Sequence, residues 1–159
     1  MPPTEPVDLV AIDHTLGMEL ILPVYAPPWA QPLPVTMIIP SKSEALDVLQ
    51  LYLQDPTWLK STWFTEGSLL DRRAGGAAVR VENDVQCEVV MIPLGDGQVT
   101  EGEIEGVISG TARALEDDFD RALMISDSQA GLQGITSTAA RSGQFRAIKY
   151  DQLIRAAMQ

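Results

Sequence analysis

The chain has 159 residues, of which 45% are hydrophobic, and a formal net charge of −11 at pH 7. This length suits one globular domain that buries about 70% of the surface of its unfolded chain. The excess of acidic residues disfavours direct contact with nucleic acid, whose phosphates attract Lys and Arg, so no direct nucleic-acid partner is expected. The sequence has no apolar run of about 18 residues and no basic leader, which predicts a cytoplasmic protein without membrane association.

The first forty residues predict strands around a proline-rich loop. "VDLVAID", "MELILPVY" and "PVTMIIP" are rich in aliphatic residues and read as three strands, the first two joined as a hairpin by "HTLG". Residues 23–35 hold five prolines, which prevent regular strand pairing. We therefore expect an ordered loop at 23–35. Trp29 in this loop is expected to be partly exposed and is a candidate anchor for a partner, because tryptophan is enriched among binding hot spots.

Helix signals follow the loop. Ser41 and Glu44 have the spacing of a capping box before "ALDVLQLYL", which predicts a helix. Asp55, followed by a proline, is typical of the start of a second, short helix that runs through Trp58 and Trp63.

The remaining elements indicate the fold class. "GSLLDRRAGG" is turn-like, "AAVRVENDVQCEVVMIP" predicts a hairpin that turns at "END", and "ALMIS" and "FRAIKY" are short strand candidates. "SDSQAGLQGITSTAARSGQ" reads as loop, and Asp151 suits the start of a last helix. The prediction is a single α+β domain over 1–159, with a mainly antiparallel sheet of hairpins and a long acidic helix packed on one face; residues 124–159 form a possible C-terminal extension.

The long acidic helix is expected over 100–123, because Thr100 and Glu103 form a second capping box. On a helical wheel, one arc is predicted to face the sheet: Ile104, Val107, Ile108, Thr111, Leu115, Phe119 and Ala122. The opposite side carries a stripe of Gly102, Gly106 and Gly110, beside Asp117 and Asp120. An exposed helical glycine costs about 1 kcal/mol relative to alanine, so the stripe suggests a second protein packing closely on it. The alternative is a frayed first half of the helix that tolerates glycine.

A search for chemistry in the sequence finds little. His14 is the only histidine and Cys87 the only cysteine, so neither a hydrolase triad nor a zinc site is predicted. The acids of "EDDFD" look helical, whereas a calcium loop needs a turn with glycine. No cofactor or metal is expected. The aromatic residues could line a ligand pocket or pack in the core: Tyr25, Trp29, Trp58 and Trp63.

The charge distribution leads to a functional hypothesis. Residues 95–120 carry eight acids and one base, Arg113, whereas 141–159 carry an excess of bases. One interpretation is internal attraction between the tail and the acidic helix. The other is a docking surface for a basic protein, formed by Glu116, Asp117 and Asp120 beside the glycine stripe.

The preferred function is non-catalytic binding of a basic protein, as by an inhibitor, an immunity protein or an anti-defence protein. The alternatives are a secretion-chaperone-like protein or structural or assembly component, with a homodimer possible, and a small carboxylate-dependent enzyme or ligand-binding protein. The order of elements over residues 7–123, together with the acidity, resembles the fold of type III secretion chaperones. That resemblance implies an acidic protein that binds other proteins, and it transfers no site residue.

Overall fold

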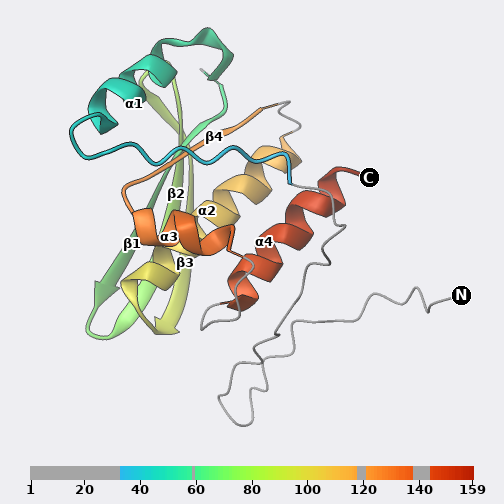
Figure 1. Cartoon of the computed structure of the whole chain (residues 1–159). Helices are drawn as coiled ribbons and strands as arrows, with labels where there is room; N and C mark the ends of the chain where they lie inside the picture. The colour runs from blue at the N-terminus through green and yellow to red at the C-terminus, as the bar shows by residue number, and fades with distance from the viewer. Residues whose placement is uncertain (1–32, 59, 118–120, 138–143) are drawn as a thin grey trace, which may run out of the picture.

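The computed structural model describes residues 33–58, 60–117, 121–137 and 144–159. Four helices, a 3-10 turn and a four-stranded sheet follow one another along the chain (Figure 1). In chain order they are α1 (Ala45–Gln54), η1 (Pro56–Trp58), β1 (Thr62–Leu70), β2 (Arg73–Glu82), β3 (Val85–Asp96), α2 (Val99–Glu116), β4 (Leu123–Ser126), α3 (Gln129–Ile135) and α4 (Gln144–Ala157). The predicted α+β single domain is confirmed.

The sheet is mixed, with strand order β3-β2-β1-β4. β1, β2 and β3 pair antiparallel through two-residue turns, and β4 pairs parallel to β1. Both turns hold two residues at positive φ, Asp71–Arg72 at 49° and 67° and Asn83–Asp84 at 51° and 60°. This backbone matches the right-handed twist of the strands that it joins. The hairpin at "END" was predicted; the first hairpin was not, because "GSLLDRRAGG" was interpreted as a turn although its first four residues belong to β1.

The glycines of α2 face the sheet, so their predicted position on the far side of the helix is wrong. A Cβ atom would come within 2.7 Å of the Ala77 carbonyl oxygen at Gly106 and within 3.2 Å of the Ala78 Cβ atom at Gly110. Gly102 is buried in the same way. The three glycines therefore allow the helix axis to approach the sheet closely.

The aliphatic arc of α2 faces the other helices. Ile104, Val107 and Ile108 form a core with residues of α3 and α4, including Ile135 and Tyr150. α2 is thus covered on two sides, by the sheet and by α3 and α4 (Figure 1). The helical wheel assumes that only the most apolar arc meets the core, and it fails for a helix buried on both faces.

Several local predictions are corrected. Residues 34–40 are described and form no strand, and "FRAIKY" lies in α4. The predicted loop after β4 contains α3, whose first turn is capped by the Ser128 Oγ atom accepting from the Gly131 amide at 3.0 Å. α2 begins one residue before Thr100, and its start is held by the Gln98 amide, which donates to Glu101 Oε2 at 2.7 Å. The two strands predicted before residue 33 lie outside the described residues.

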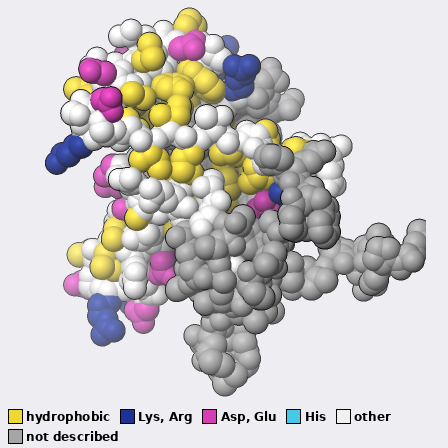
Figure 2. All heavy atoms as spheres, viewed as in Figure 1, with side chains coloured by type: hydrophobic (Ala, Val, Ile, Leu, Met, Phe, Trp, Pro, Cys, Tyr) yellow, Lys and Arg dark blue, Asp and Glu magenta, His cyan; other side chains and the backbone are white. Residues whose placement is uncertain are grey.

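α1 lies at one end of the molecule and buries none of its residues. Figure 2 shows hydrophobic side chains gathered over α1 and in a band below it, and acidic side chains scattered over this face. After α1, Asp55 Oδ1 accepts from the Thr57 amide at 2.9 Å, as expected for the start of a short helix. That helix is only the 3-10 turn Pro56–Trp58, because Trp63 belongs to β1. Within the described ranges, no helix has the length and hydrophobicity that a membrane span requires.

Candidate active site

Two carboxylates lie at neighbouring positions on the parallel strands β1 and β4. Thr65 of β1 is in register with Ser126 of β4, so Glu66 and Asp127 come directly after the paired residues. Thr65 Oγ1 donates to the carbonyl oxygen of Ile125 at 3.2 Å and helps hold the two strand ends together. Glu66 and Asp127 are both exposed. β4 ends at Ser126, whereas β1 continues beyond the paired Thr65 to Leu70.

A third carboxylate reaches the same edge from α2. The side chain of Glu103 passes over Gly67, where a Cβ atom would lie 2.5 Å from Glu103 Cγ. On its other side, a Cβ atom at Gly131 of α3 would be 3.6 Å from Glu103 Cβ. Gly67 therefore provides the space that Glu103 occupies. Glu66 and Asp127 therefore lie beside each other on the β1–β4 pair, and Glu103 of α2 lies against Gly67, the residue after Glu66.

These three carboxylates differ from their acidic neighbours in having no ion pair or hydrogen bond with another described side chain. Glu101 and Glu105, two residues before and after Glu103, are both paired with bases of α4. Arg146 Nη1 is 3.0 Å from Glu101 Oε1, and Arg146 Nε is 3.2 Å from Glu105 Oε1. Lys149 Nζ is 2.9 Å from Glu105 Oε2. The interpretation of the charge pattern as attraction between the basic tail and the acidic helix is confirmed, and Glu103 has no such partner among the described side chains.

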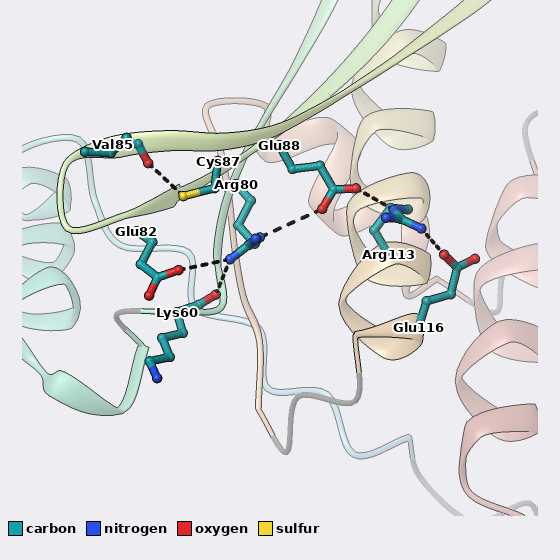
Figure 3. A network of polar contacts seen from close by, with 8 residues as sticks. All are labelled: Lys60, Arg80, Glu82, Val85, Cys87, Glu88, Arg113 and Glu116. Carbon is teal, nitrogen blue, oxygen red and sulfur yellow. Dashed lines mark hydrogen bonds and ion pairs between the residues drawn. The ribbon is translucent and has the colours of Figure 1, made fainter.

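A second ionic network lies further along α2 (Figure 3). Glu88 of β3 accepts from Arg113 Nε at 2.6 Å and is 3.9 Å from Arg80 Nε, and Arg113 also binds Glu116. The hydrogen bond to Glu88, and then that to Glu116, raises the pKa of the Arg113 guanidinium. This network ties β2 and β3 to the last turns of α2.

The residues predicted to bind a partner do not form one surface. Gly102, Gly106 and Gly110 are buried against the sheet and cannot meet a second protein. Glu116 is exposed but paired with Arg113, and Asp117 is exposed at the end of α2. Asp120 and Trp29 lie outside the described residues. A partner contact at the two remaining acids stays a prediction.

The other sequence candidates are dispersed. Trp63 is fully buried in the core with Ala78 and Ala114, and Trp58 is half-buried. Cys87 is exposed, and its thiol donates to the Val85 carbonyl oxygen. His14 and Tyr25 lie outside the described residues.

A metal site is not formed by the side chains as they stand. Among the described residues, no three Asp, Glu, His or Cys side chains are grouped so that they could hold a metal ion. Strand alternation explains part of this, because Thr65 and Gly67 face α2 and Glu66 therefore points to the opposite face of the sheet. Repulsion between the negatively charged carboxylates also keeps them apart.

The fold matches solved structures, although no protein-family model and no curated protein matches the sequence. Forty-eight chains of solved structures match. The foamy viral protease-reverse transcriptase in complex with dsDNA is 15% identical, with a TM-score of 0.52 over 64% of this chain and 78% of that one. The same protein in complex with an RNA/DNA hybrid is 15% identical, with a TM-score of 0.52 over 80% of this chain and 18% of that one. RNase H1 from the archaeon Halobacterium salinarum is 17% identical, with a TM-score of 0.48 over 61% of this chain and 75% of that one.

These matches correct the functional hypotheses drawn from charge. The fold is shared with the foamy viral protease-reverse transcriptase, solved in complex with dsDNA and with an RNA/DNA hybrid, which contradicts the hypothesis of a non-catalytic inhibitor or immunity protein acting on a basic partner. The expected absence of enzymatic activity and of a direct nucleic-acid partner is contradicted by the same matches. Net charge is a poor guide to the ligand because it averages over the whole surface, whereas a site depends on the few groups that face the ligand.

Glu66 and Asp127 were not among the residues that the sequence singled out, and Glu103 was predicted only as part of a helix cap. A local signal existed: "FTEG" and "ISDS" each place a carboxylate directly after a hydroxyl residue at the end of an apolar segment. The signal was lost because β1 was not recognised as a strand. The pairing of β1 with β4, which brings the two carboxylates together, joins residues about 60 positions apart.

Proposed function

We propose that this chain is a nuclease that hydrolyses phosphodiester bonds, with an RNA/DNA hybrid as the preferred substrate and Glu66, Glu103 and Asp127 as the catalytic carboxylates. The observation that carries the proposal is that Glu66 and Asp127 take neighbouring positions on β1 and after β4, with Glu103 against Gly67, and that all three are unpaired among the described residues. The fold shared with a reverse transcriptase solved in complex with an RNA/DNA hybrid supports the choice of substrate. A cytoplasmic location, where such a substrate is accessible, is part of the proposal.

The chemistry needs a base, a positioned water and a place for the leaving group. The oxygen of water attacks the phosphorus atom while its proton passes to the base, the bond to the leaving oxygen breaks, and that oxygen takes up a proton from the solvent. Glu103 is the best-placed base, because it is half-buried beside Gly67 and Gly131 and no described Lys or Arg pairs with it. Glu66 of β1 and Asp127, which follows β4, are exposed and would orient the water and the scissile phosphate.

The test is hydrolysis of end-labelled RNA/DNA hybrid, with single-stranded RNA, double-stranded RNA and dsDNA of the same sequence as competitors. Each reaction is run with Mg²⁺, with Mn²⁺ and with EDTA, so that activity is found in whichever condition supports it. The hybrid is expected to be cleaved fastest. Glu103→Gln is expected to lower the rate by about 100-fold or more, since general acid–base catalysis contributes about that much.

Matched variants separate the site from its surroundings. Glu66→Gln and Asp127→Asn should also lower the rate, whereas Glu116→Gln and Asp117→Asn change acids of the same type outside the site and should leave it unchanged. A wild-type protein that cleaves none of the four substrates would reject the proposal. Equal activity of Glu103→Gln and wild type would show that the cleavage comes from another group or from a contaminating nuclease.

A further inference from the structure

Arg146 spans the two acids that flank Glu103. Its Nη1 atom is 3.0 Å from Glu101 Oε1 and its Nε atom is 3.2 Å from Glu105 Oε1, so one guanidinium holds two carboxylates that are one helical turn apart. Its Cζ atom also lies 4.3 Å from the centre of the Phe145 ring. The side chains of Arg146 and Glu105 are only 9% and 7% exposed. The planar, five-donor guanidinium suits such a bridge, and a lysine ammonium does not.

The bridge and Glu103 lie on different sides of the same helical turn. At about 100° per residue, Glu103 points about 200° away from Glu101 and from Glu105. Arg146 therefore holds the helix from the side of α4, while Glu103 crosses Gly67 on the side of the sheet. The first turns of α2 are held between these two contacts, and so is the direction in which Glu103 extends.

We infer that Arg146 is a positioning residue for Glu103: its bridge from Glu101 to Glu105 fixes the helical turn that presents Glu103 at the site. The inference rests on the proposed nuclease function for its catalytic consequence. Lys149 is a secondary support, because it contacts only Glu105 and is 49% exposed. Together with Lys149, Arg146 also balances the two negative charges of Glu101 and Glu105 beside Glu103.

The test compares Arg146→Lys with a matched change on the same helix. Arg146→Lys keeps the positive charge and loses the bridge. Arg155→Lys is the control, because Arg155 pairs with Asp151 of its own helix at 2.8 Å. With RNA/DNA hybrid well below the melting temperature, kcat of Arg146→Lys is expected to fall about tenfold, as for a misplaced catalytic group, with KM within about twofold of wild type. Lys149→Met and Arg155→Lys are expected to keep both constants within about twofold. Unchanged kcat in Arg146→Lys, or a rise in KM alone, would overturn the inference.

A second measurement does not depend on activity. Amide hydrogen exchange of the folded proteins reports how firmly the first turns of α2 are held. Amides of residues 102–106 should exchange about tenfold faster in Arg146→Lys than in wild type and in Arg155→Lys, while those of 108–115 keep their rates. Equal exchange rates in all three proteins would overturn the inference that the Arg146 bridge holds the first turns of α2. If the wild type cleaves no substrate but the exchange rates change as expected, the proposed function fails, whereas the role of the Arg146 bridge in holding α2 is supported.

Discussion

Gly102 of α2 lies directly on the backbone of Gly75 in β2, so closely that a Cβ atom at Gly102 would stand 2.0 Å from the Gly75 carbonyl oxygen. No side chain can occupy that distance without moving the helix or the strand. The contact sets the separation between α2 and the sheet, and at that separation the side chain of Glu103 lies against Gly67 of β1. The glycines of α2 therefore serve the packing of the domain and the geometry of the candidate site.

Gly102→Ala should destabilise the protein. Alanine improves helix propensity by about 1 kcal/mol, but the new methyl group meets rigid backbone, and overpacking of this kind costs about 1–3 kcal/mol or more. Because the obstacle is a carbonyl group and not a flexible side chain, we expect a net loss of about 2 kcal/mol in the free energy of unfolding, measured by urea denaturation. Ser109→Ala, on the same helix at a half-buried position, should change stability by less than about 0.5 kcal/mol. A stabilised Gly102→Ala protein would show that the helix does not lie this close to the sheet.

Tyr150 should make stability fall at high pH. Burial raises the pKa of the Tyr150 phenol above its usual value of 10.0, and the hydrogen bond to Thr111 opposes this only in part. Above about pH 10 the unfolded chain loses the phenolic proton while the folded chain retains it. The stabilising contribution is therefore complete below the unfolded pKa and is lost as the pH rises through the folded pKa.

The comparison with Tyr150→Phe measures this effect. At pH 8 the variant should be less stable by about 1 kcal/mol, because one hydrogen bond is lost. Between pH 10 and pH 11, unfolding free energies from urea titrations should fall less steeply for Tyr150→Phe than for wild type. Parallel slopes would mean that the phenol ionises as readily in the folded protein as in the unfolded chain.

Arg72 is a position where glycine should be better than the natural residue. Its φ is 67°, in the left-handed region that costs a residue with a Cβ atom about 1 kcal/mol. Arg72→Gly should therefore raise the free energy of unfolding by up to about 1 kcal/mol, because two-residue turns of this type favour glycine. Arg73→Gly, one position later in β2, should lower it by about 0.5–1 kcal/mol. Thermal unfolding of both variants gives the sign directly, and a destabilised Arg72→Gly would point to a side-chain contact of Arg72.

The buried pair of Arg146 and Glu105 should show strong coupling in stability. Arg146→Met leaves the Glu105 carboxylate with Lys149 alone and should cost about 3 kcal/mol, since an uncompensated buried charge is expensive. The double variant Arg146→Met/Glu105→Gln removes that charge and should recover at least about half of the loss. Chemical denaturation of the wild type, both single variants and the double variant completes the cycle. If the losses in unfolding free energy of the two single variants add up to that of the double variant, the interaction between Arg146 and Glu105 contributes little to stability.

Local sequence patterns predicted the elements whose structure depends on nearby residues. The turn at Asn83–Asp84, the helix after Ser41 and the short strand at 123–126 were all predicted, because turn formers, capping residues and aliphatic runs act within a few positions. The same patterns failed at β1 and α4. "TWFTEGSLL" carries a glycine and a carboxylate that weaken its strand propensity, and it forms the strand next to β4 only because two neighbours pair with it.

What the sequence determined by itself was the α+β class, and its charge distribution offered the attraction between the acidic helix and the basic tail as one of two interpretations. These follow from composition, periodicity and charge, which act over short distances or over the whole chain. Only the tertiary structure decided which face of α2 meets the sheet and which of its acids remain unpaired. Glu101, Glu103 and Glu105 are alike in sequence, and they differ because Arg146 binds the outer two and Gly67 makes room for the middle one. Contacts between residues about 40 positions apart select the candidate catalytic acid, and no local pattern records them.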